Sequence, residues 1–202
     1  MKKLVFAIVF VASSINAKAQ NEYIIHLNDT VFEFSLDQEY KTTVNGNEFS
    51  FTIKAKDTLL YHDDFYSFNY LKDYKISKMV IDEGIEQIVI MTAEGSGIMI
   101  QKYTSISPTL FNEMMISEVT KESLNYGFEL TRQDYDRTLK SGQKINVDKA
   151  VLTYKEETNT YEVASIGNKD EGILIMTMIM DENYSKQGRK IINLMWESLN
   201  YK

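Results

Sequence analysis

Residues 172–180 read Gly-Ile-Leu-Ile-Met-Thr-Met-Ile-Met, and this stretch decides the fold of the chain. In an extended strand, alternate side chains point to opposite faces of the sheet. Both alternations are apolar here: Ile173, Ile175 and Ile179 on one, and Leu174, Met176, Met178 and Met180 on the other. Both faces must therefore be covered, which predicts a central strand. The stretch is too short to cross a bilayer as a helix, which takes about 20 residues.

Three further strands are expected ahead of this one. β-Branched and aromatic residues recur at 128–134, 144–154 and 160–166. Turn-forming residues separate the strands at Ser141-Gly142, 157–159 and 168–172. Strands joined by such short turns pair antiparallel.

Two amphipathic helices are expected to cover this sheet. The first begins at Ser107-Pro108, with Ser107 as N-cap and Pro108 at the first helical position, and Gly127 ends it. The second runs over about 184–200, where Gly188 allows close approach to the sheet. Antiparallel strands with helices packed against them define an α+β fold class.

Upstream of the first helix, strands are predicted at 65–70, 74–81, 85–92 and 98–103, with a hairpin turn at 94–97 between the last two. Still earlier, two β-rich runs flank Asn45-Gly46. This pair is a strong hairpin signal because both residues tolerate the positive φ of a type I′ turn. The front of the chain is therefore β-rich, and it forms either a small satellite or extra strands on the main sheet.

One segment resembles a known family. Residues 68–76, Phe-Asn-Tyr-Leu-Lys-Asp-Tyr-Lys-Ile, are similar to the opening F-x-Y-P-x-x-Y/W segment of the Mog1/PsbP-like α/β/α sandwich family, with Leu71 in place of the proline. The order of elements over about 65–201 is similar as well. The resemblance implies a mainly antiparallel sheet flanked by two helices. It also implies a binding or assembly factor without catalytic residues. The resemblance therefore assigns no functional role to any residue of this chain.

The first nineteen residues indicate where the protein acts. Lys2 and Lys3 precede a mostly apolar run at 4–15, and Ala17-Lys18-Ala19 supplies the small residues of a cleavage site. We therefore expect a secretory signal peptide over 1–19, cleaved near Ala19, and a bacterial protein that is periplasmic or secreted. The expected organisation is the signal peptide, a β-rich extension over 20–60 and an α+β sandwich domain over 61–202, with no membrane span in the mature form.

Composition excludes several kinds of chemistry. The chain has no cysteine, which removes disulfides, thiol catalysis and zinc-thiolate sites. Loss of Lys2, Lys3 and Lys18 with the signal peptide takes the formal net charge from −7 to −10. Because such an acidic chain repels phosphate backbones, we expect no nucleic-acid partner.

The best polar cluster is His62-Asp63-Asp64. An imidazole beside carboxylates is suited to binding a divalent metal or relaying protons. Adjacent strand residues point to opposite faces, however, so the three side chains meet one ion only if the chain turns there. The cluster is a candidate metal site, and a solvated loop is its alternative. We assign no catalytic or cofactor-binding residue and expect no cofactor.

Three other motifs have structural alternatives. The thioethers of Met176, Met178 and Met180 suit Cu(I), but methionine also fills irregular cores. The acidic run 181–183 lacks the spacing of a calcium loop, so Asp181 is interpreted as a charge at the start of the closing helix. Asn28-Asp29-Thr30 fits the N-glycosylation pattern, which also arises by chance.

The sequence thus favours an exported, non-enzymatic binding or assembly domain. Its partner is either an unknown protein or a small apolar ligand held between sheet and helix. The alternative is a metal-dependent hydrolase of an unfamiliar type that uses His62, Asp63 and Asp64.

Overall fold

The computed structural model describes residues 22–27, 30–44 and 47–202. The predicted signal peptide, Asn28-Asp29 of the glycosylation pattern and the Asn45-Gly46 turn lie outside the described residues. The chain divides into two units, Met1–Ala55 and Lys56–Lys202. The second unit begins ahead of the predicted boundary at residue 61, because residues 58–62 form a strand that pairs within it.

The first unit consists of two hairpins, β1 (Glu22–Leu27) with β2 (Thr30–Ser35) and β3 (Glu39–Val44) with β4 (Asn47–Thr52). Three aromatic rings join them. Phe34 of β2 lies 4.8 Å from Tyr40 and 5.3 Å from Phe51, centroid to centroid. The Ser35 backbone N–H donates to the Tyr40 hydroxyl at 2.6 Å. These contacts link the two hairpins of the first unit.

The second unit is built on one antiparallel main sheet. Its strands are β7 (Ser77–Asp82), β8 (Ile85–Met91), β9 (Gly97–Tyr103), β10 (Glu129–Arg132), β11 (Tyr135–Thr138), β12 (Lys144–Tyr154), β13 (Glu157–Gly167) and β14 (Gly172–Ile179). They run in the order β10-β12-β13-β14-β9-β8-β7, and β11 also pairs with β12. The predicted central strand is confirmed, because β14 lies between β13 and β9.

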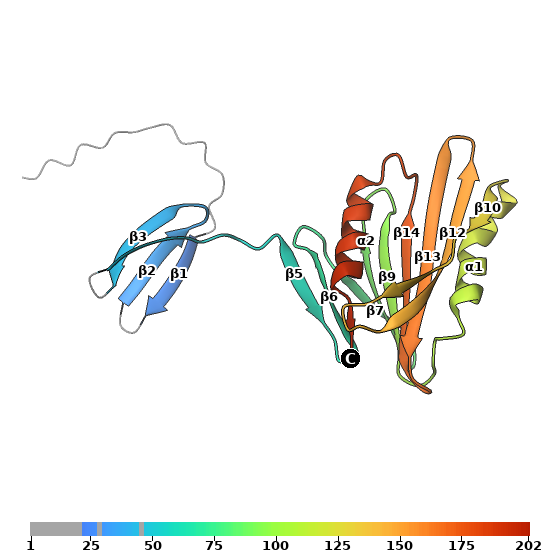
Figure 1. The fold of residues 1–202 in the computed structure, drawn as a ribbon, viewed down its shortest axis with the longest axis horizontal. Coiled ribbons are helices and arrows are strands. Elements are labelled where there is room, and N and C mark those ends of the chain that lie inside the picture. Colours follow the sequence, from blue (N-terminus) through green and yellow to red (C-terminus); the bar gives the residue numbers. More distant parts are fainter. Residues whose placement is uncertain (1–21, 28–29, 45–46) are drawn as a thin grey trace, which may run out of the picture. The chain divides into compact units, whose positions relative to one another are not determined.

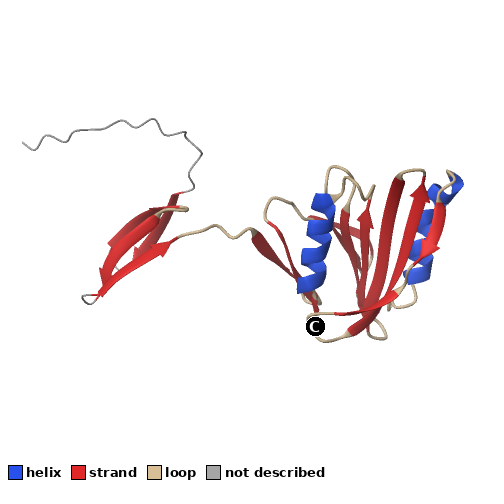
Figure 2. Cartoon of the chain, turned by 45° about the horizontal axis from the view of Figure 1, so that its top comes forward, coloured by secondary structure: helices blue, strands red, loops and turns tan. Residues whose placement is uncertain are grey.

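The two faces of β14 enter two different cores. Ile173 and Ile175 are fully buried against helix α2 (Lys186–Ser198), while Leu174 and Met176 are buried on the side of helix α1 (Asn112–Asn125). Figures 1 and 2 show the helices on opposite faces of the sheet. The predicted α+β class, a mainly antiparallel sheet flanked by two helices, is confirmed.

A second, smaller sheet packs with α2. It has the order β15-β6-β5, formed by Asn200–Tyr201, Tyr66–Leu71 and Thr58–His62 respectively. Tyr66 and Phe68 of β6 join the core on the α2 side. Because Tyr201 pairs with Tyr66, the closing helix stops at Ser198 and the chain ends as a strand. No helix in the described part of the chain is long and apolar enough to span a membrane.

Several predicted boundaries were wrong, and the contacts explain three of them. α1 starts at Asn112, with Phe111 as N-cap, because the Phe111 N–H closes a turn onto the Pro108 carbonyl at 2.9 Å. The 157–159 turn lies instead at 155–156, where Lys155 takes a φ of 54°.

The third error lies at 128–134, which was expected as one strand. The chain leaves β10 after Arg132 and re-enters the sheet as β11. The Asp134 carboxylate holds this bend by accepting the Lys149 N–H at 2.9 Å, so both pieces pair with β12.

Candidate functional site

Helix α2 separates an apolar face from a charged one. Gly188, Ile191, Ile192, Met195 and Trp196 are buried on one side, at the spacing of a 3.6-residue helix. The opposite side carries the exposed residues Lys186, Lys190, Asn193 and Glu197. Burial of the first set fixes the rotation of the helix, so the second set must line its outer surface.

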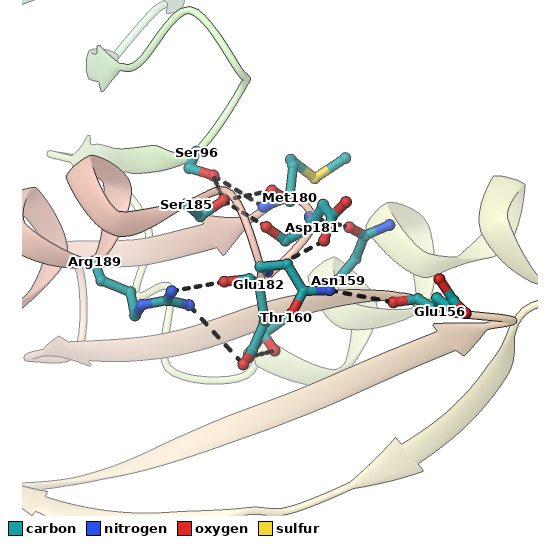
Figure 3. A network of polar contacts seen from close by, with 10 residues as sticks. Ser96, Glu156, Asn159, Thr160, Met180, Asp181, Glu182, Ser185 and Arg189 are labelled. Atoms are coloured by element: carbon teal, nitrogen blue, oxygen red, sulfur yellow. Dashed lines mark hydrogen bonds and ion pairs between the residues drawn. The ribbon is translucent and has the colours of Figure 1, made fainter.

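A buried hydroxyl pair fixes the start of α2 (Figure 3). Ser96, in the turn between β8 and β9, accepts the Met180 N–H at 2.9 Å and lies 2.8 Å from the Ser185 hydroxyl, oxygen to oxygen. The Ser185 hydroxyl in turn donates to the carbonyl oxygens of Met180 and Asp181. Ser96 is 0% and Ser185 2% exposed, so these bonds are shielded from water. The network ties the end of β14 to the first turn of α2.

Gly188 lets the same turn of α2 approach the sheet. A Cβ atom at this position would lie 2.3 Å from the Cβ atom of Ser96, far inside van der Waals contact. The predicted close approach at Gly188 is therefore confirmed, and its partner is the β8–β9 turn.

The acidic residues before α2 stabilise its entry loop. Asp181 takes a φ of 50°, and its N–H donates to the Asn159 side-chain oxygen at 2.7 Å. Glu182 accepts the Thr160 hydroxyl at 2.8 Å through its carboxylate, and its carbonyl accepts the Arg189 guanidinium at 2.6 Å. Figure 3 shows these contacts around the loop. The predicted role of Asp181 as a charge at the helix start was wrong, because α2 begins at Lys186 with Ser185 as N-cap and the Asp181 carboxylate accepts the Asn183 N–H in the entry loop.

Two adjoining hollows run along α2. The larger has a volume of about 890 Å³ and the smaller about 660 Å³, and they share Asp57, Leu71, Gln187 and Lys190. We call their combined surface the α2 groove. It is lined by Asp57, Thr58, Leu71, Asp73, Tyr74, Thr92, Ala93, Glu94, Lys186, Gln187, Arg189, Lys190, Asn193, Leu194 and Glu197.

The walls of the α2 groove differ in charge. The first turns of α2 contribute Lys186, Arg189 and Lys190. The segments facing them contribute Asp57 and Asp73, with Glu94 from the β8–β9 turn. Within the described residues, neither Lys186 nor Lys190 has an ion-pair partner, whereas Arg189 lies 4.0 Å from the Glu182 carboxylate. The groove thus offers a basic wall and an acidic wall to whatever enters it.

The predicted His62-Asp63-Asp64 cluster does not converge. The Asp63 carboxylate bonds to Lys102 at 3.1 Å and accepts the Phe65 N–H at 3.1 Å. The His62 ring is exposed and lies 3.4 Å from the Lys202 ammonium, and Asp64 is exposed. In the described part of the chain, no group of three histidine, aspartate or glutamate side chains is placed to hold a metal ion.

Lys102 instead organises an ion-pair cluster at this end of the sheet. It bridges Asp63 and Glu86, the latter at 2.9 Å, and lies 5.6 Å from the centre of the Phe65 ring. Hydrogen bonds from Lys102 and then Lys78 lower the pKa of the Glu86 carboxyl. Nearby, burial raises the pKa of the Tyr66 hydroxyl far above its usual value. The charged groups of Lys78, Lys102, Asp63 and Glu86 bind one another, so the cluster serves the fold.

The predicted thioether run divides between core and surface. Met176 is buried in the core on the α1 side, while Met178 and Met180 pack half-buried at its margin. The Met180 sulfur accepts the Tyr161 hydroxyl at 3.4 Å. Met176 therefore fills the core, as the structural alternative to a Cu(I) site expected.

The α2 groove was missed by sequence reasoning. Its acidic wall combines Asp57, Asp73 and Glu94, which are distant in sequence and meet only through the fold. The one available signal was the pair Lys186 and Lys190, one turn apart on the outer face of the closing helix.

Comparisons with known proteins bear on the fold. No protein-family model and no curated protein matches the sequence. The chain is similar to the solution structure of cyanobacterial PsbP from Synechocystis sp. PCC 6803, at 12% identity and a TM-score of 0.47, over 74% of this chain and 95% of that one. It is also similar to a crystal structure from Bacteroides thetaiotaomicron, at 13% identity and a TM-score of 0.37, over 68% of this chain and 45% of that one. Both likenesses concern the fold alone.

Replacing Ser185 with alanine should lower the free energy of unfolding by about 1–3 kcal/mol, because Ser96 loses the partner of its hydroxyl and two carbonyl oxygens lose a donor in a buried setting. Urea unfolding followed by circular dichroism measures the change. The control is Ser117→Ala on the exposed side of α1, expected within about 0.5 kcal/mol of the wild type. Equal effects of the two substitutions would show that the hydroxyl pair does not fix α2.

Replacing Lys102 with methionine should raise the pKa of Glu86 towards its usual value of 4.5, because the larger of its two stabilising hydrogen bonds is lost. In the wild type this pKa is lower folded than unfolded. The stabilisation is therefore complete above the unfolded pKa and disappears as the pH falls through the folded one. Carbon-13 NMR titration of Glu86 measures the shift. An unchanged midpoint in the variant would contradict the assigned role of Lys102.

Proposed function

We propose that the Lys56–Lys202 unit is a non-enzymatic binding or assembly domain of an exported protein, and that a partner protein binds in the α2 groove. The opposed charge of the two walls carries this proposal. Lys186 and Lys190 are exposed and have no ion-pair partner in the described structure. Asp73 and Glu94 line the smaller hollow together with Lys190. Complementary charges on a partner would steer its approach and fix its orientation.

A protein segment fits this lining better than a small apolar ligand does. Leucines are few among the lining residues, which are mostly charged or amide-bearing. The space between sheet and α2 is occupied by core side chains such as Ile175, Ile191 and Met195. An extended segment alternates its side chains between two sides. Acidic side chains on one side and basic ones on the other would meet the two walls of the groove.

The position of α2 makes this surface suitable for recognition. The bonds of Ser96 and Ser185 and the close contact at Gly188 hold the basic wall against the sheet. A wall already in place loses little freedom on binding, which preserves affinity.

Reversing the charge of the basic wall should weaken partner binding. In this experiment the tagged mature protein recovers its partner from the cell envelope of the source organism. The affinity of the purified, identified partner is then measured for the wild type and for the Lys186→Glu/Lys190→Glu variant. The variant should bind at least 10-fold more weakly, because two favourable contacts become repulsive.

The matched control is Lys144→Glu/Lys169→Glu, which makes the same change of charge at exposed positions away from the groove. It should bind like the wild type. Equal affinity of the two variants would remove the groove as the binding site. Turnover of a small substrate by the isolated chain would overturn the non-enzymatic assignment.

A further inference from the structure

Methionines collect on one face of the main sheet. In an antiparallel pair, residues directly opposite one another point to the same face. Met176, buried on the α1 side, lies opposite Met99, while Met178 lies opposite Gly97, which in turn faces Met91. The row Leu174, Gln101, Gln87 and Met79 extends the same face to the edge strand β7.

Met180, which follows β14, and Met115 of α1 lie on the same side. Seven of the ten methionines of the chain are therefore on this side of the sheet: Met79, Met91, Met99, Met115, Met176, Met178 and Met180. Among the other three, Met195 is buried with α2 and Met114 is exposed on α1. Such a concentration is not needed to fill a core, because isoleucine and leucine fill the opposite face of the same strands.

Much of this face is open. Helix α1 packs over β12 and β13, so β9, β8 and β7 lie beside it and not beneath it. Met91, Met99 and Met178 are half-buried, and Met79 is 42% exposed. A polar row crosses the strands between them: the Tyr103 hydroxyl donates to Gln101, and Gln101 donates to Gln87 at 2.9 Å. These hydrogen bonds fix the orientation of the polar side chains on the open face.

The flank of α1 that borders the open face is acidic. The other flank faces β10, because Glu113, Ser117 and Leu124 line a hollow there together with residues of β10. At 100° per residue, Met115, Glu118 and Glu122 fall on the other flank, towards β14 and β9. No carboxylate of Glu118 or Glu122 has an ion-pair partner within the described residues. We call the surface formed by these three residues with Met79, Met91, Met99 and Met178 the methionine trough.

We propose that the methionine trough binds an amphipathic helix of a partner protein that is apolar on one face and carries lysine or arginine along its edge. Strands lie about 4.8 Å apart, so β9 to β7 offer a floor about 10–14 Å wide, which matches a helix with its side chains. Methionine is flexible and polarisable, and it adapts to apolar faces of different shape. Glu118 and Glu122 supply the charge that selects a basic edge. This binding would place a second helix beside α1 and is independent of the α2 groove.

The test uses the full mature chain labelled with carbon-13 at the methionine methyl groups. The probe is an 18-residue peptide of leucine and lysine, with leucines at i, i+3, i+4 and i+7. The methyl signals of Met79, Met91, Met99 and Met178 should shift and saturate at micromolar peptide. The signals of Met114 and Met195 should remain in place. A peptide with glutamate for every lysine should bind at least 10-fold more weakly.

Two variants separate the apolar floor from the acidic edge. Met79→Lys, at an exposed position that tolerates the change, and Glu118→Lys/Glu122→Lys should each weaken binding at least 10-fold. Met114→Lys and Glu129→Lys/Glu156→Lys are the matched controls at exposed positions outside the trough, and they should bind like the wild type. The proposal is overturned if no methyl signal of the trough shifts, if both peptides bind equally, or if the controls lose as much affinity as the trough variants.

Discussion

Burial of β14 on both of its faces is the constraint on which the rest of the second unit depends. Ile173 and Ile175 point to one core and Leu174 and Met176 to the other, and all four are buried. A strand with this pattern is stable only between two covered surfaces. One helix must therefore lie on each side of the sheet. The strands that flank β14 must extend the sheet so that both helices have a surface to pack against. The layered architecture follows from this requirement.

The two helices meet the constraint in different ways, which leaves two different surfaces. α2 is strongly amphipathic and is fixed at its start by Ser96, Ser185 and Gly188, so its charged side forms one wall of the α2 groove. α1 packs over β12 and β13 and leaves the methionine-rich part of the face on its side only half-buried. The α2 groove is therefore lined by α2, the small sheet and the β8–β9 turn, whereas the methionine trough lies on the opposite face of the main sheet.

The sequence predicted those elements whose structure is determined by a pattern within one short segment. The double alternation of 172–180, the amphipathic pattern over about 184–200 and the turn at 94–97 predicted the central strand, the closing helix and a hairpin. One failure was local: Ser107-Pro108 resembles a helix start, yet the turn between Phe111 and Pro108 delays α1. The other failures lie where distant segments decide the outcome. Asp63 is a neighbour of His62 in sequence, but in the fold Lys102 binds it. The acidic wall of the α2 groove draws on three separate segments, so no local pattern could reveal it.

Native-state hydrogen exchange of β14 tests the central claim most directly. If double-sided burial of this strand supports the whole unit, amides of β14 that bond to β9 and β13 exchange only when the unit unfolds globally. Their exchange free energy should then equal the free energy of unfolding measured with urea, whereas amides of the edge strand β7 should exchange with a lower one. Exchange of β14 through a local opening, at a free energy below that of β10 or β7, would contradict the account.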